Sequence, residues 1–331
     1  MKKLINDPFD VVDELLDGFT LAHADVVRLA SPHVVARVAP VAGKVGVVVG
    51  GGSGHEPAFA GYVGPGLADA AALGNVFAAP SPDICLDAIR AASTGAGVVV
   101  VYGNYAGDVL NFDIAVADAA SEGIECRTVL VTDDVASASL AERQRRRGIA
   151  GDVFVFKIAG AAADRGDDLA GVERSARRAN EACSSIGVAL SACEVPGAGR
   201  PTFEIGPDEI EIGMGIHGEP GIERGSLQAA DAIVERMLDA ILRDRAADGR
   251  IPGEVALLVN GLGATSYMDL YIMCRAAFRV LGDADFEVSR MFVGEYVTSL
   301  EMAGASLTVM DLDAELRALL DAPARSARWP A

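Results

Sequence analysis

The chain has 331 residues, of which 51% are hydrophobic and 23% are charged, and its formal net charge is −19 at pH 7. This composition is typical of a globular protein with a large apolar core, and the length predicts two domains or one large one. The strong negative charge excludes a nucleic-acid-binding protein, because contact with phosphate backbones requires a basic surface.

The N-terminal segment and the cysteines indicate where the protein works. Asp7, Pro8 and Asp10 stand where a signal peptide would have an apolar run, and the sequence contains no stretch of about 18 apolar residues. The five cysteines are scattered and form no CxxC pair, which is typical of reduced thiols and gives no indication of a zinc site. We therefore expect a cytoplasmic protein without a membrane span.

Strands and helices alternate in the first part of the chain. Short β-branched runs predict buried strands, and amphipathic stretches predict helices. The segments are helix 9–31, strand 44–50, helix 81–94, strand 97–102, helix 109–123 and strand 126–134. This alternation predicts an α/β fold with a mostly parallel or mixed sheet flanked by helices. The basic run 142–148 is predicted to be the solvated end of a surface helix.

The second part of the chain continues this alternation. It is predicted to contain a largely helical segment 151–184, strand 187–193, helix 226–244, strand 254–259, helix 266–282 and strands 286–293 and 306–311. We place a boundary near residue 185. This gives an N-terminal α/β domain of residues 1–185 and a C-terminal α/β domain of residues 186–331, with the active site expected between them.

Two of the four histidines lie in glycine-rich segments. His55 belongs to "GGGSGHEP" and His217 to "GMGIHGEPGI". These segments and "GNYAGD", which contains Asp108, directly follow predicted strands. In open α/β sheets ligands bind at the carboxyl ends of the strands, so all three segments are candidate binding loops.

Three common motifs are excluded. "GMGIHG" matches GxGxxG, but helical periodicity begins only near Ser226, so no helix N-terminus could face a dinucleotide. "GGSGH" has His55 where the nucleophile elbow GxSxG requires a small residue. The sequence contains no GxxxxGK[ST], and therefore no nucleotide site that the sequence can reveal.

Other roles for Asp108 and for the two histidines stay open at this stage. Asp108 follows Gly107 and precedes a helical segment, so it could be a helix N-cap. His55, Glu56, His217 and Glu219 could together bind a metal ion, although the spacing within each pair is too short for ligands on one helix. We therefore predict no metal site.

Eight segments in order resemble the dihydroxyacetone kinase K subunit, and the resemblance runs from Met1 to near the C-terminus. They are "MKKLIND", "PVAGKVGVVVGGGSGHEP", "GNYAGDVLNFDIA", "RRGIAG", "GAAADRGDDL", "IGVALSACEVPGAG", "GMGIHGEPGIER" and "NGLGAT". An ordered set of this kind is far more specific than any single motif.

The resemblance implies catalytic roles for three residues. His217 would bind dihydroxyacetone covalently, as a hemiaminal between a ring nitrogen and the ketone carbon. His55 would polarise the substrate or exchange protons with it, and Asp108 would act as general base on the hydroxyl to be phosphorylated. We add the hypothesis that Glu219 holds the other ring nitrogen of His217 and fixes its tautomer.

The resemblance also implies a substrate-binding loop, and the sequence departs from the family near it. Gly52, Ser53 and Gly54 would hold the substrate beside His55. The family motif usually reads "KNYTGD", whereas here Gly103 stands at the lysine position and Ala106 at the threonine position. The loss of these polar groups predicts either a pocket for a longer ketose such as erythrulose or weaker phosphorylation.

The implied cofactors and partners lie outside this chain. Single-chain members that use ATP carry a further nucleotide-binding domain beyond this length. We therefore expect no cofactor on this chain and a separate L-type subunit that carries ATP or ADP with Mg²⁺, fed directly or by a phosphotransferase-system protein. A homodimer is also implied. The alternative functions are a non-catalytic, ketone-binding sensor or coactivator and a kinase subunit for the four-carbon ketose erythrulose.

Overall fold

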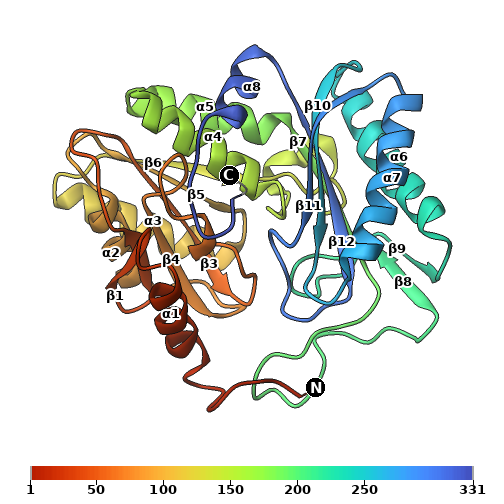
Figure 1. The fold of residues 1–331 in the computed structure, drawn as a ribbon, viewed down its shortest axis with the longest axis horizontal. Coiled ribbons are helices and arrows are strands. Elements are labelled where there is room, and N and C mark those ends of the chain that lie inside the picture. Colours follow the sequence, from red (N-terminus) through yellow and green to blue (C-terminus); the bar gives the residue numbers. More distant parts are fainter. Residues whose placement is uncertain (1, 330–331) are drawn as a thin grey trace.

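The computed structural model describes residues 2–329 and contains two six-stranded sheets flanked by helices. Figure 1 shows the sheets side by side, the first built from the N-terminal part of the chain and the second from the C-terminal part. The predicted α/β fold class is confirmed. The second sheet begins at Cys183. The boundary near residue 185 remains a proposal.

The first sheet has the order β1-β2-β4-β3-β5-β6. Its strands are β1 Val27–Ser31, β2 Val34–Arg37, β3 Gly46–Ser53, β4 Ala70–Val76, β5 Val98–Gly103 and β6 Cys126–Val131. β4, β3, β5 and β6 run parallel to one another. The carboxyl ends of the two central strands, β3 and β5, therefore lie at one edge, which is where an α/β sheet binds ligands.

The second sheet has the order β11-β10-β12-β7-β8-β9. Its strands are β7 Cys183–Ala189, β8 Glu209–Ile212, β9 Glu223–Ser226, β10 Glu254–Gly261, β11 Glu287–Gly294 and β12 Gly304–Asp311. Only β10 and β11 form a parallel pair in it. Together the sheets are mixed, as the sequence predicted.

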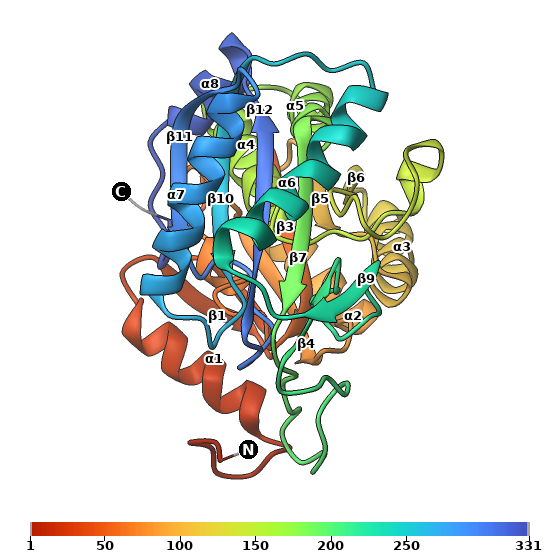
Figure 2. The same ribbon diagram turned by 90° about the vertical axis from the view of Figure 1, so that its right-hand side faces the viewer.

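Helices cover the faces of both sheets, as the two views in Figures 1 and 2 show. They are α1 Val11–Ala22, α2 Pro82–Ala92, α3 Ala106–Ser121, α4 Asp152–Arg165, α5 Leu169–Ala182, α6 Ala230–Ala247, α7 Tyr267–Asp283 and α8 Ala314–Asp321, with two 3₁₀ turns, η1 Ala60–Tyr62 and η2 Leu140–Arg145.

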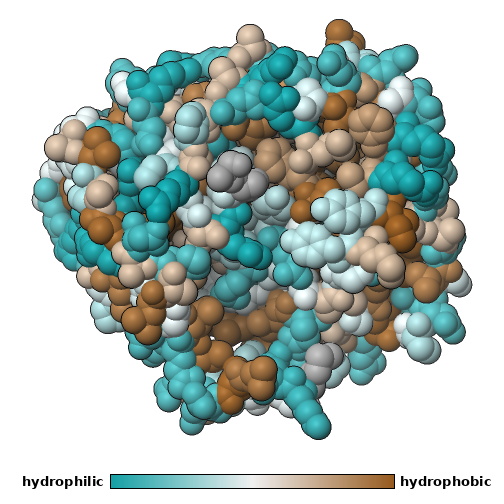
Figure 3. All heavy atoms as spheres, in the orientation of Figure 1, coloured by the Kyte–Doolittle hydropathy of each residue, from teal (hydrophilic) through white to brown (hydrophobic). Residues whose placement is uncertain are grey.

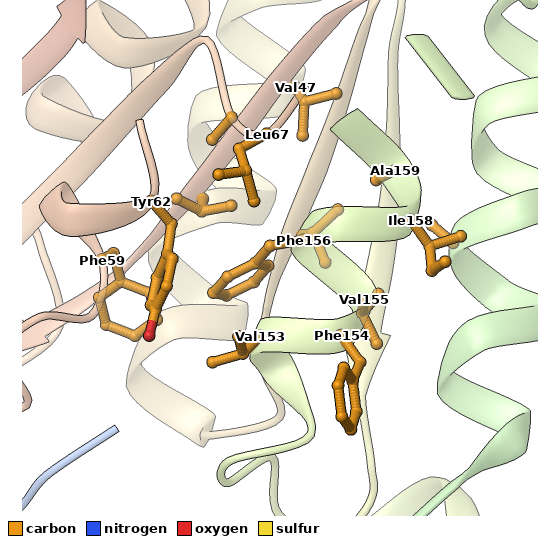
Figure 4. Close-up of a cluster of buried hydrophobic side chains, with 14 of the residues drawn as sticks. Val47, Phe59, Tyr62, Leu67, Val153, Phe154, Val155, Phe156, Ile158 and Ala159 are labelled. Atoms are coloured by element: carbon orange, nitrogen blue, oxygen red, sulfur yellow. The ribbon is translucent and has the colours of Figure 1, made fainter. Parts of the chain in front are cut away.

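Helix α4 lies between the two sheets and is buried on all sides from Asp152 to Ala163. On one side Phe156 packs at 6.0 Å from Phe59, measured between ring centroids, and on the other Phe154 packs at 5.5 Å from Phe292 of β11. Figure 4 shows Phe156 on the side of the helix that faces Phe59, and Phe154 on another side. A helix with apolar residues on all of its faces must be buried in this way, and here Asp152 and Lys157 are buried with them.

Two predicted elements differ from the structure. The predicted helix 9–31 ends at Ala22, and residues 27–31 form β1, because Val27 and its neighbours pair with β2 as an antiparallel edge. The predicted strand 187–193 begins earlier, at Cys183, because all seven residues of β7 are buried between β12 and β8.

The basic run 142–148 is only in part the solvated helix end that we predicted, because Arg145 at the end of η2 is exposed but the two arginines after it are not. Arg146 is only 2% exposed, and its Nη1 donates to Asp244 of α6 at 2.9 Å. Arg147 forms an ion pair with the buried carboxylate of Asp134 at 2.7 Å. These two cations therefore stabilise contacts between segments instead of facing solvent.

The described residues contain no helix long and apolar enough to span a membrane. On the face shown in Figure 3, hydrophobic and hydrophilic residues are interspersed.

Candidate active site

One small pocket brings together most of the residues singled out by the sequence. It is lined by the end of β3, the end of β5, the first turn of α3 and the loop after β8. Its walls include Gly52, His55, Gly103, Asp108 and His217. The pocket therefore combines residues from the first sheet with a histidine from the second half of the chain.

Two of the predicted substrate-loop residues do not line this pocket. The Ser53 hydroxyl donates a hydrogen bond to the carbonyl oxygen of Gly74 at 2.7 Å. The Gly54 N–H donates to the Glu56 carboxylate at 3.0 Å. Both residues shape the loop that carries His55. Ala106 is exposed and also lies outside the pocket wall, so the missing threonine hydroxyl would not have faced this pocket.

The two histidine rings meet, with 2.9 Å between their Nε2 atoms. His55 Nδ1 lies 2.8 Å from the carbonyl oxygen of Thr298. A carbonyl oxygen can only accept, so Nδ1 carries the proton and Nε2 presents a lone pair to His217. Burial, with the charge of His217 as the second cause, lowers the pKa of His55 to about 3, so this ring is neutral.

His217 Nδ1 lies 2.9 Å from Glu219 Oε1, so the contact that we predicted for Glu219 is confirmed. Burial opposes the ionisation of Glu219, but the hydrogen bond and the charge of His217 outweigh it and lower the pKa of this carboxyl. Nδ1 of His217 therefore donates to a carboxylate. Because Nε2 of His55 carries no proton and can only accept, the 2.9 Å contact between the rings requires a proton on Nε2 of His217.

Aromatic rings surround the histidine pair. Phe77 stacks on His55 with 5.0 Å between centroids, and Tyr105 meets the edge of His217 at 4.9 Å. The Tyr105 hydroxyl donates to the carbonyl oxygen of Gly148 at 3.0 Å, which fixes the ring against the pocket. Phe77 adopts a φ of 56°, a strained conformation for a bulky residue that is found preferentially at functional sites.

Asp108 faces the pocket from the first turn of α3. It is not the N-cap of the helix, because Tyr105 occupies that position. The carboxyl is 9% exposed, and its Oδ1 has no hydrogen-bond partner among the described residues. Burial raises the pKa of Asp108 to about 6, and the charge of His217 opposes this shift. A carboxylate of this kind is able to take a proton from a bound hydroxyl.

Three pocket or support residues were missed in the sequence. Tyr105 and Asp152 line the pocket, and the Thr298 carbonyl holds His55 from a loop more than 200 positions away. Asp152 directly follows the quoted "RRGIAG", so its position beside a motif was visible. Nothing in the sequence marks a backbone carbonyl, whereas Tyr105 lies inside the quoted "GNYAGD" but was given no role there.

Of the four residues considered as a metal site, His55, His217 and Glu219 contact one another through the histidine rings, but Glu56 does not join them. The Glu56 carboxylate accepts from the Gly54 N–H instead of facing the histidines. Within residues 2–329, no group of three or more His, Cys, Asp or Glu side chains is placed to hold a metal ion.

Comparison with known proteins identifies the family. The Dak1 domain model matches residues 17–328, nearly the whole chain. The chain belongs to the Dak1 domain family.

Two curated relatives show how the family uses this domain. The Dak1 chain is 44% identical over 98% of its length to the dihydroxyacetone-binding subunit DhaK of a PTS-dependent dihydroxyacetone kinase of Listeria innocua, of which it covers 97%. It is 47% identical over 98% of its length to the D-erythrulose kinase of Mycolicibacterium smegmatis. The chain spans only 56% of the length of that second relative.

Solved structures of the family have the same fold. The dihydroxyacetone kinase of C. freundii in complex with AMP-PNP and Mg²⁺ has a TM-score of 0.91 and 34% identity, over 99% of this Dak1 chain and 61% of that one. A dihydroxyacetone kinase operon co-activator, DhaQ, has a TM-score of 0.89 and 31% identity, over 95% of this chain and 97% of that one. The fold alone therefore does not separate a kinase subunit from a coactivator.

Proposed function

We propose that this chain is the substrate-binding and catalytic subunit of a kinase for dihydroxyacetone or a related short-chain ketose. The observation that carries the proposal is the convergence of His217, His55 and Asp108 in one pocket. The names of the curated relatives, a dihydroxyacetone-binding subunit and an erythrulose kinase, support the same class of substrate.

The histidine pair supplies both the nucleophile and the proton for ketone capture. As Nε2 of His217 attacks, its proton passes across the 2.9 Å contact to Nε2 of His55, which relays it onward and is not held as a cation. The His217 nitrogen attacks the ketone carbon, and the carbonyl electron pair moves to the oxygen, which takes the proton from His55. The product is a hemiaminal whose imidazolium charge lies against the Glu219 carboxylate.

Asp108 then acts on a hydroxyl of the captured ketose. Its carboxylate accepts the hydroxyl proton as the oxygen attacks the phosphorus of the donor, as the base does in other kinases. The unpartnered Oδ1 of Asp108 leaves a free acceptor in the pocket for this hydroxyl.

The phosphoryl group is proposed to come from an L-type partner subunit that binds ATP or ADP with Mg²⁺. The name of the Listeria relative describes one subunit of a PTS-dependent kinase, which supports a donor protein of this kind.

We also propose a homodimer and a cytoplasmic location. The five free cysteines of the described chain support the latter. Light scattering and cell fractionation test these two points.

Glu219→Gln is expected to weaken ketone binding by about 10-fold, because a charge-assisted hydrogen bond to Nδ1 of His217 becomes a neutral one. Titration calorimetry with dihydroxyacetone measures the change, and repeating it over a range of pH shows whether the profile moves. Unchanged affinity and an unchanged pH profile would remove Glu219 from the mechanism.

The kinase rate is expected to depend on pH through Asp108. Its raised pKa of about 6 means that the carboxylate is available above this pH and is protonated below it. With an L-type partner, kcat/KM should rise with pH up to about 6 and then level off, with one ionisation on the acid side. A profile that stays flat down to pH 5 would contradict the base assignment.

The experiment that tests the proposal is calorimetric binding of dihydroxyacetone and glycerol to the purified chain. Glycerol has nearly the same shape but no carbonyl for His217 to attack. We expect the ketone to bind and glycerol not to bind. Equal binding of both, or of neither, would overturn covalent capture. A coactivator would share this binding but would not need the Asp108 carboxylate, so the Asp108 variant described below separates the two functions.

A further inference from the structure

Helix α7 carries apolar side chains on two of its faces. Its inner face packs on the second sheet through five buried residues, Leu270, Met273, Ala276, Ala277 and Leu281. Its outer face presents five more large apolar side chains, Tyr267, Met268, Tyr271, Ile272 and Phe278. These five are between 41% and 70% exposed, and Figure 2 shows their helix at the surface of the molecule. Single exposed apolar residues are normal, but a contiguous group of them indicates an interaction site.

An apolar cavity continues this outer face toward helix α6. It has a volume of about 320 Å³, and Ile272 and Met273 of α7 and Ile233 of α6 line it. Leu190 and Leu227, which are 37% and 55% exposed, line it as well. We call the five outer residues of α7 together with this cavity the α7 surface. It combines projecting side chains with a hollow, and a surface of this kind is able to pair with a copy of itself about a twofold axis.

The charges beside the α7 surface favour a second copy of this chain as its partner. Two copies with a net charge of −19 each repel one another unless they meet where charges are balanced. Here Arg275 donates to Asp231 of α6, and Arg279 donates to Glu235 at 2.8 Å, so these cations neutralise their neighbours. If two α7 helices pack antiparallel, Asp269 near the start of one also lies opposite Arg279 near the end of the other, and the two charges are complementary.

The length of α7 suits an interface of ordinary size. A stable interface covers about 800 Å² on each partner, which corresponds to a patch about 30 Å across. The 17 residues of α7 span about 26 Å at 1.5 Å per residue, and the cavity widens the surface toward α6. The α7 surface is therefore large enough to hold two copies together.

We propose that the α7 surface is the interface of the homodimer, with the α7 helices of the two copies packed antiparallel. This inference rests on the proposed homodimer but not on the ketone chemistry, because the α7 surface and the active-site pocket share no residue. Dimerisation removes the outer side chains of α7 from water, which is the main favourable term in association.

The oligomeric state of the purified chain tests this interface. Light scattering is expected to give twice the mass of the chain. Met268→Asp and Tyr271→Asp are each expected to weaken dimerisation by about 10-fold or more, because a carboxylate buried in an interface loses its water without gaining a partner. Leu21→Asp is the matched control: Leu21 is 80% exposed on helix α1, and this variant should stay dimeric.

A wild-type chain that is monomeric at every concentration tested would overturn the proposal, and so would a dimer that survives Met268→Asp and Tyr271→Asp combined. If these variants do not fold, hydroxyl-radical footprinting of the wild type decides. Met268 and Tyr271 should become more reactive when the dimer is diluted, and unchanged reactivity would contradict the interface. Calorimetry with dihydroxyacetone separates this proposal from the proposed function: a wild-type dimer that binds no ketone removes ketone capture and leaves the interface standing.

Discussion

His217→Ala is expected to abolish measurable ketone binding, with a loss of at least about 100-fold in affinity. At a ceiling of about −1.5 kcal/mol per non-hydrogen atom, a triose with roughly six such atoms gains at most about −9 kcal/mol from non-covalent contacts, and polar ligands seldom reach this value. If the ketone is captured as proposed, the covalent bond to Nε2 of His217 is expected to supply most of the affinity. Titration calorimetry with dihydroxyacetone and both erythruloses measures the loss.

His23→Ala is the matched control for this variant. His23 lies outside the active-site pocket, beside Phe19 with 5.0 Å between ring centroids, so its replacement should leave ketone binding as in the wild type. A His217→Ala protein that folds and still binds dihydroxyacetone with wild-type affinity would show that the ketone is not captured by this ring.

Asp108→Asn is expected to keep ketone binding and to reduce phosphorylation by about 10²- to 10⁴-fold, the usual contribution of a general base. The amide has nearly the same shape as the carboxyl but cannot accept the hydroxyl proton. The rate is measured with an L-type partner, ATP and Mg²⁺, and binding by calorimetry on the isolated chain. Asp113→Asn, on the exposed side of the same helix, is the control.

Asp108→Asn is expected to reduce the phosphorylation rate but to increase the stability of the folded chain. The pKa of Asp108 is raised in the folded chain to about 6 from an ordinary value of 3.8. Between these two pH values the unfolded chain therefore binds fewer protons than the folded chain. Ionisation of Asp108 therefore lowers the free energy of unfolding as pH rises from about 4 to about 6. Above pH 6, Asp108→Asn should melt at a higher temperature than the wild type. Loss of activity with a lower melting temperature would indicate structural damage instead of loss of the base.

The sequence predicted the strand-rich core well and its edges poorly. The β-branched run predicted as strand 97–102 corresponds to β5, Val98–Gly103, which is buried throughout, and such a pattern alone identifies a central strand. β1 was missed because it is a half-exposed edge strand, and its pairing with β2 depends on contacts that periodicity does not encode. The start of β7 was misplaced because small, polar Ser184 and Ser185 give no strand signal although both are buried.

The candidate site was predicted through the residues of three motifs, whereas the side chains of Tyr105 and Asp152 and the backbone carbonyl of Thr298 were missed. His55, Asp108 and His217 were identified through their motifs, and the contact between Glu219 and His217 followed from spacing within one loop. The contact between the two histidines and the carbonyl of Thr298 depend on how the two sheets pack. No local pattern encodes such long-range placement, so it required the structure.

Helix α4 has a consequence for the whole molecule. Its side chains belong to one hydrophobic cluster with Val47 and Tyr62 from the first half and with Ala256 and Trp329 from the second. Neither sheet can therefore lose its packing without exposing the helix that the other also needs. The two halves should unfold as a single cooperative unit, and the His55–His217 distance is held by this shared core and not by a hinge.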